Sequence, residues 1–73
     1  MRYLIDIRDK ILIREKEPLD LEVYSYSDKV WVYKDWLVGV YDGDMTCITV
    51  SEKDANDIIS GKNTCEEIIK KYR

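Results

Sequence analysis

The chain has 73 residues, of which 45% are hydrophobic and 37% are charged, and its net charge is −3. This length leaves room for one small core, so we expect a single domain over residues 1–73. The apolar content argues against disorder. A nucleic-acid partner is disfavoured, because the sequence has no concentrated basic face to neutralise phosphates.

Several common kinds of site and segment are missing from the sequence. Charged residues interrupt Met1–Ile13, so no secretory signal is expected, and no apolar run reaches the length of about 20 residues that a membrane helix needs. The chain has no histidine, and Cys47 and Cys65 lie far apart, which favours free thiols over a zinc site. We therefore expect a cytoplasmic protein that is not an enzyme, has no cofactor or metal, and does not bind a membrane.

The first half, residues 1–50, is expected to form the sheet. Arg2–Arg8 alternates in polarity, and Ile11–Arg14 follows a turn at Asp9–Lys10. A single helix over Leu4–Lys16 is the alternative, but the isoleucines favour strands. Pro18 ends this region.

The next stretch repeats short apolar runs separated by turn residues. The strands predicted there are Leu21–Tyr26, Val30–Tyr33, Trp36–Tyr41 and Met45–Val50. Their predicted turns are Asp28–Lys29, Lys34–Asp35 and Asp42–Gly43, of which the last is the strongest hairpin signal. The fold class is thus α+β: an antiparallel β-meander of about four to six strands, either open or curled into a barrel, followed by two short C-terminal helices.

Residues 51–73 are expected to form these two helices, packed on the sheet. Ser51 is a good N-cap, with Asp54 three residues later in a variant capping box. Gly61 is expected to end the first helix. Thr64 and Glu67 form a T-x-x-E capping box for the second.

Hairpins centred on the predicted turns place Tyr26 opposite Trp31 and Tyr24 opposite Tyr33. They also place Trp36 opposite Tyr33. One sheet face then gathers apolar and aromatic side chains: Tyr24, Tyr26, Trp31, Tyr33, Trp36, Val38 and Val40. The opposite face is also apolar, with Val32, Leu37, Ile48 and Val50. Because two short helices cover only one face, either the sheet curls or one face contacts a second molecule.

The choice of aromatic residues favours the second molecule. Six tyrosines, two tryptophans and no phenylalanine suit a surface that is apolar but partly wet. We expect a protein-binding module that contacts its partner through Tyr24, Tyr26, Trp31, Tyr33 and Trp36. The partner would be a second copy, in a homodimer, or a larger host protein that this chain inhibits, as phage and mobile-element inhibitors do.

Four alternatives remain open at this point. The aromatic residues could stack on a small ligand or nucleotide, or the chain could be an accessory subunit of a larger assembly. The aromatic residues could also be cross-strand pairs that only stabilise the sheet. Carboxylates at predicted turns, Asp9, Asp28, Asp42 and Asp44, could gather at one end and attract a cation or a basic surface, although aspartate is also an ordinary turn residue.

Overall fold

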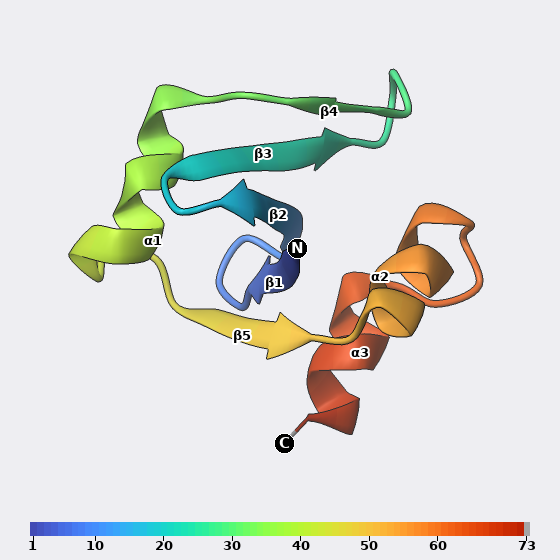
Figure 1. The fold of residues 1–73 in the computed structure, drawn as a ribbon. Coiled ribbons are helices and arrows are strands. Elements are labelled where there is room, and N and C mark those ends of the chain that lie inside the picture. Colours follow the sequence, from blue (N-terminus) through green and yellow to red (C-terminus); the bar gives the residue numbers. More distant parts are fainter. Residues whose placement is uncertain (73) are drawn as a thin grey trace.

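The computed structural model describes residues 1–72 and shows an open five-stranded antiparallel sheet with helical segments on both faces (Figure 1). The strands are β1 (Arg2–Asp6), β2 (Ile11–Glu17), β3 (Asp20–Ser25), β4 (Val30–Val32) and β5 (Cys47–Val50), in the order β4-β3-β2-β1-β5. The helical segments are the 3-10 helix η1 (Asp35–Val38) and the α-helices α1 (Gly39–Asp42), α2 (Glu52–Ile59) and α3 (Cys65–Lys71). The predicted α+β class and meander are confirmed, and the barrel alternative is wrong because the sheet does not close.

The N-terminal segment forms the β1–β2 hairpin, so the alternative helix over Leu4–Lys16 is wrong. Leu4 pairs with Ile13 and Ile5 with Leu12, and alternation sends each pair to opposite faces. The pair Ile5 and Leu12 lies on the face covered by α2 and α3, while Leu4 and Ile13 lie on the other. The β1–β2 hairpin therefore contributes to both layers of the core.

The segment Trp36–Tyr41 is not the predicted strand but the helical stretch η1–α1. Its apolar run is too short for periodicity to separate a strand from a helix. Leu37 decides the outcome, because its side chain is buried against Leu4 and Leu21 on the second sheet face. The predicted Asp42–Gly43 hairpin is wrong for the same reason: Gly43, with φ of 84°, is the left-handed residue that ends α1.

The chain itself therefore covers both faces of the sheet. In Figure 1 the green η1–α1 segment and the orange and red helices α2 and α3 lie on different sides of the sheet. The expected choice between a barrel and a partner on a bare sheet face does not arise. The question becomes which side chains remain exposed on the outside of these covering segments.

The register between β3 and β4 also differs from the expected one. Tyr24 pairs with Trp31, rather than Tyr26 with Trp31 or Tyr24 with Tyr33. The turn has four residues instead of two, closed by a hydrogen bond from the Lys29 amide to the Ser25 carbonyl at 2.7 Å. A shift of two residues keeps Tyr24 and Trp31 on one face, as predicted.

The C-terminal helices begin where the sequence predicts. The Ser51 hydroxyl accepts a hydrogen bond from the Asp54 amide at 3.1 Å, and Thr64 and Glu67 make both bonds of a capping box. Gly61, with φ of 84°, follows the end of α2. None of the helices within residues 1–72 combines the length and apolar character needed to cross a membrane.

Candidate protein-interaction surface

Three of the five predicted contact residues form an aromatic cluster, in which Tyr24 contacts both Trp31 and Tyr26, and the ring centroids of Tyr24 and Tyr26 are 5.3 Å apart. Tyr24 is only 8% exposed, and its ring centroid lies 5.3 Å from that of Trp31. Trp31 is half-buried, with Tyr3 at 6.3 Å on one side and the Arg14 guanidinium 4.5 Å from its ring centroid. These contacts stabilise neighbouring strands, as the alternative of cross-strand pairing predicts.

The third predicted residue, Tyr26, lies on an exposed turn beside a groove of about 440 Å³. Its hydroxyl shares a hydrogen bond with Cys65 Sγ at 3.2 Å, and burial together with this bond raises the pKa of the tyrosine. Burial also raises the pKa of the Cys65 thiol. The groove is lined by Lys10, Tyr26, Ile58, Gly61, Asn63, Thr64, Cys65 and Glu66. The Tyr26 hydroxyl and the Cys65 thiol therefore both stay protonated at neutral pH.

The last two, Tyr33 and Trp36, lie on the η1–α1 side and are exposed. Tyr33 borders a shallow pocket of about 150 Å³, which Trp36 does not line. The lining residues are Leu19, Leu21, Tyr33, Asp35, Leu37, Val38 and Tyr41. The predicted set is thus divided between two sides of the molecule, rather than gathered on one face as the sequence indicated.

We call the exposed apolar residues around this pocket the η1 surface: Leu19, Tyr33, Val38 and Tyr41. Leu19 is the most exposed of them, at 74%, while Leu21 and Leu37 are buried beneath the surface. Leu19, Val38 and Tyr41 are absent from the predicted contact set. Leu19 carried a detectable signal, because a leucine directly after Pro18 occupies a turn position that usually holds glycine or asparagine.

Tyr41 connects α1 to the β2–β3 turn. Its hydroxyl accepts a hydrogen bond from the Leu19 amide at 2.9 Å and donates to the Glu15 carboxylate. Arg2 Nε lies 3.0 Å from the same carboxylate. The bond from Tyr41, and then the one from Arg2, lower the pKa of Glu15, while the bond to Glu15 raises the pKa of Tyr41. The two walls of the pocket are therefore fixed relative to each other.

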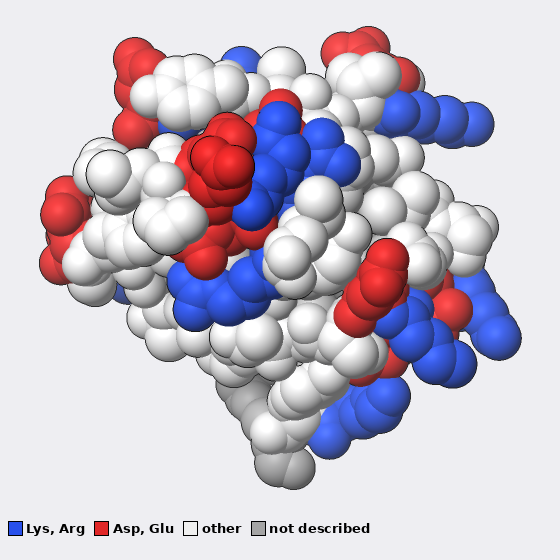
Figure 2. Space-filling model, viewed as in Figure 1, with Lys and Arg blue, Asp and Glu red and all other residues white. Residues whose placement is uncertain are grey.

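Acidic side chains accompany the η1 surface. Asp35 lines the pocket, and Asp42 and Asp44 follow Tyr41 in the chain, whereas Lys34 is the only basic residue of segment 33–46. In Figure 2, red side chains lie among white ones on the side of α1, and some blue side chains are visible nearby. Asp35 thus lies at the pocket, and the segment around it has more acidic than basic side chains, while Arg2 lies near Tyr41 through their shared contact with Glu15.

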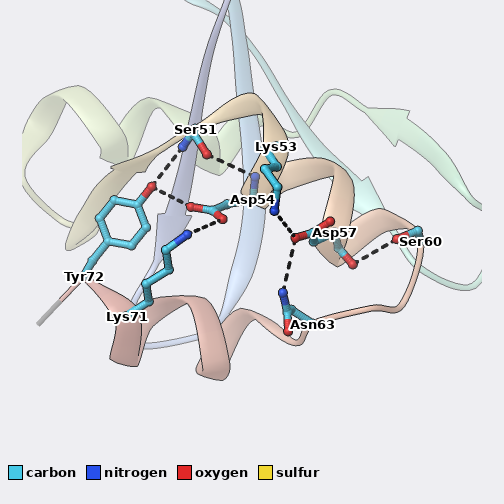
Figure 3. Close-up of polar contacts among 8 residues, drawn as sticks. All are labelled: Ser51, Lys53, Asp54, Asp57, Ser60, Asn63, Lys71 and Tyr72. Atoms are coloured by element: carbon cyan, nitrogen blue, oxygen red, sulfur yellow. Dashed lines mark hydrogen bonds and ion pairs between the residues drawn. The ribbon is translucent and has the colours of Figure 1, made fainter.

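The most connected polar group lies elsewhere, between α2 and α3 (Figure 3). Asp54 is 2% exposed, and its carboxylate accepts hydrogen bonds from the Tyr72 hydroxyl at 2.7 Å and from Lys71 Nζ at 2.9 Å. The Ser51 amide donates to the same Tyr72 hydroxyl at 3.1 Å. Tyr72, Lys71 and then Ser51 lower the pKa of Asp54. Because every member bonds to another, the network holds the two helices together.

The acidic turns do not form a metal centre. Within residues 1–72, no three His, Cys, Asp or Glu side chains are close enough to hold an ion. Asp42 and Asp44 belong to the end of α1 and the segment after it, not to the hairpin turn that was expected to bring them beside Asp9 and Asp28. Cys47 and Cys65 are both free thiols.

No family model, curated protein or solved structure matches this chain.

Proposed function

We propose that this protein is a small non-enzymatic binding module that attaches to another protein through the η1 surface. The observation that supports the proposal most is the position of the surface. Segment 33–41 buries the side chain of Leu37 and exposes Tyr33, Val38 and Tyr41 on the η1 surface. Trp36, in the same segment, is also exposed but does not line the pocket. Contiguous exposed apolar side chains on a small protein are typical of contact sites.

The size of the pocket favours a protein over a small ligand. Sites for small molecules usually enclose about 300–1,000 Å³, whereas the pocket on the η1 surface has about 150 Å³. The larger groove beside Tyr26 falls in the small-ligand range, but polar groups on its wall already bond within the chain. Tyr26 bonds to Cys65, and Asn63 bonds to Asp57 at 3.3 Å. The η1 surface is therefore the better candidate.

The charges favour a different protein over a second copy. In a symmetric dimer the same patch lies on both sides of the interface, so the acidic excess of Asp35, Asp42 and Asp44 would meet a surface with the same acidic excess. Like charges placed opposite one another cost binding energy, while complementary charges steer association. The proposed partner therefore presents an apolar side chain surrounded by lysine or arginine. A module of this size would act by covering that site on a larger protein.

Photo-crosslinking in the native cell tests the proposal with a matched pair of positions. A photoreactive amino acid replaces Val38, which is 53% exposed on the η1 surface, or Val30, which is 49% exposed on β4 outside it. We expect a discrete adduct of larger mass from position 38 and none from position 30. The same adduct from both positions, or none from position 38, would contradict the proposal. An adduct of twice the chain mass would contradict the choice of a different protein.

A further inference from the structure

The turn that carries Leu19 has an unfavourable residue at its most constrained position. Pro18 and Leu19 are the only residues between β2 and β3, because Glu17 pairs directly with Asp20. Leu19 has φ of 71°, which matches the third position of a type II turn, where glycine or asparagine is preferred and proline commonly precedes it. A bulky side chain at positive φ is sterically unfavourable.

Leu19 differs from the other residues with this backbone conformation. Within residues 1–72, the non-glycine residues at positive φ are Lys10, Leu19 and Lys29. The two lysines are exposed polar side chains in hairpin turns and keep their ammonium groups in water. Leu19 is apolar and 74% exposed, so it combines an unfavourable backbone with unfavourable exposure of its side chain. Neither feature contributes to folding.

The chain nevertheless holds Leu19 in place. The Tyr41 hydroxyl accepts its amide hydrogen at 2.9 Å and is itself anchored by Glu15, which Arg2 contacts. Leu19 and Tyr41 thereby line the same small pocket. Strain that the surrounding structure enforces is characteristic of binding and active sites.

We propose that Leu19 is the specificity-determining anchor of the η1 surface, held beside Tyr41 to form a socket for one apolar side chain of a basic partner segment. This inference rests on the proposed function. An enclosed apolar cavity of about 150 Å³ accommodates a benzene ring, so a pocket of about 150 Å³ suits one leucine-sized or phenyl-sized side chain. Asp35, which lines the pocket, would contact a lysine or arginine that flanks the inserted residue.

Three substitutions of Leu19 separate binding from stability. Leu19→Gly removes both the side chain and the strain, Leu19→Ala removes the side chain alone, and Leu19→Met keeps an apolar side chain. With the photoreactive residue at position 38, we expect the adduct yield to fall at least tenfold for the first two and to stay within twofold for Leu19→Met. We expect the midpoint of thermal unfolding of Leu19→Gly to equal or exceed that of the unsubstituted protein and to exceed that of Leu19→Ala.

The outcomes distinguish this inference from the proposed function. An unchanged adduct yield for Leu19→Gly would show that Leu19 is not the anchor, although the η1 surface would still be the contact site. A clearly lower unfolding midpoint for Leu19→Gly would show that Leu19 has a structural role, and would overturn the inference. Absence of any adduct from position 38 in the unsubstituted chain would instead overturn the proposed function.

The chemistry of the partner is tested with synthetic peptides. One set has a central leucine or phenylalanine flanked by lysines, and the matched set has the same centre flanked by glutamates. In NMR titrations we expect the lysine set to shift the amide resonances of Leu19, Val38 and Tyr41, and the glutamate set to shift none. Equal shifts from both sets, or none from the lysine set, would overturn the basic partner segment.

Discussion

The helical segments that cover the two faces of the sheet differ in length and in how their first turns are capped. On one face, α2 and α3 begin with side-chain caps, Ser51 and Thr64, and Asp54 ties the two helices together. On the other face, η1 and α1 have four residues each, and neither has a side-chain cap at its beginning. Helices this short are not stable alone, so η1 and α1 depend on packing against the sheet.

The two covering segments also differ in which residues they bury in the core. The α2–α3 pair buries apolar residues in the core: Ala55, Ile58, Cys65, Ile68 and Ile69. The η1–α1 segment buries Leu37 and Gly39, and a side chain at Gly39 would approach Met45 Cγ to 3.1 Å. Its remaining large apolar side chains are exposed or half-buried. The comparison shows that α2 and α3 bury most of their large apolar side chains, whereas η1 and α1 bury Leu37 and leave most of theirs exposed.

The largest expected effect on the free energy of unfolding comes from removing the side chain of Leu37, through which η1 packs on the sheet. Leu37 is 1% exposed, so Leu37→Ala removes a buried side chain and leaves a cavity, which should lower the free energy of unfolding by about 3 kcal/mol. Val38→Ala, one residue along and 53% exposed, should change it by less than about 0.5 kcal/mol. Urea denaturation measures both. A loss of less than about 1 kcal/mol for Leu37→Ala would mean that η1 does not depend on this contact.

The second-largest effect on stability is expected on the face of the sheet that α2 and α3 cover. Asp54→Asn removes the charge that Lys71 pairs with and weakens the bond from Tyr72, so the free energy of unfolding at pH 7 should fall by about 1–2 kcal/mol. The exposed Asp44, changed to asparagine, is the control and should have almost no effect. Denaturation at pH 7 compares the two variants, and equal stability losses would contradict the role of the network.

The same carboxylate gives a pH dependence. The folded structure lowers the pKa of Asp54 below its ordinary value of 3.8, so its contribution is present above that value and is lost as the pH falls through the folded pKa. The stability difference between the unsubstituted protein and Asp54→Asn should therefore be constant near neutrality and shrink below about pH 4. A difference that stays unchanged at pH 3 would show that the charge of Asp54 contributes nothing.

Most of the fold could be predicted because its signals are local. Alternation in Arg2–Asp6 and Asp20–Ser25 identifies strands, and the caps Ser51 and Thr64 identify the start of each C-terminal helix. The error at Trp36–Tyr41 arose because its five apolar residues fit a strand as well as a helix. The buried position of Leu37 on the far face of the sheet is a tertiary contact that no local pattern specifies.

The candidate site was predicted less completely, for a related reason. Tyr33 and Trp36 are exposed, as a contact role requires. They do not share a face with Tyr24 and Trp31, because β4 ends at Val32 and Trp36 lies in η1 rather than in a strand. Leu19 and Tyr41 are 22 residues apart and meet only because η1–α1 folds back over the sheet. The sequence shows an unusual residue after Pro18, but not the tyrosine that holds it.

The smallest expected effect tests that contact. Tyr41→Phe keeps the ring but removes the hydroxyl between the Leu19 amide and Glu15, so the free energy of unfolding should fall by no more than about 1 kcal/mol. The Leu19 amide should exchange its hydrogen faster, and the pKa of Glu15 should rise toward its ordinary value of 4.5 because its largest lowering contact is lost. NMR measures both quantities.

Tyr33→Phe is the matched control for this contact. Tyr33 lies on the same surface, and its hydroxyl makes no hydrogen bond to any other part of residues 1–72, so neither quantity should change. If Tyr41→Phe leaves the exchange of the Leu19 amide as slow as before, the β2–β3 turn holds its own strained conformation. Tyr41 would then be only a wall of the pocket, and the rigidity of the η1 surface would come from Pro18 and the strands on either side of it.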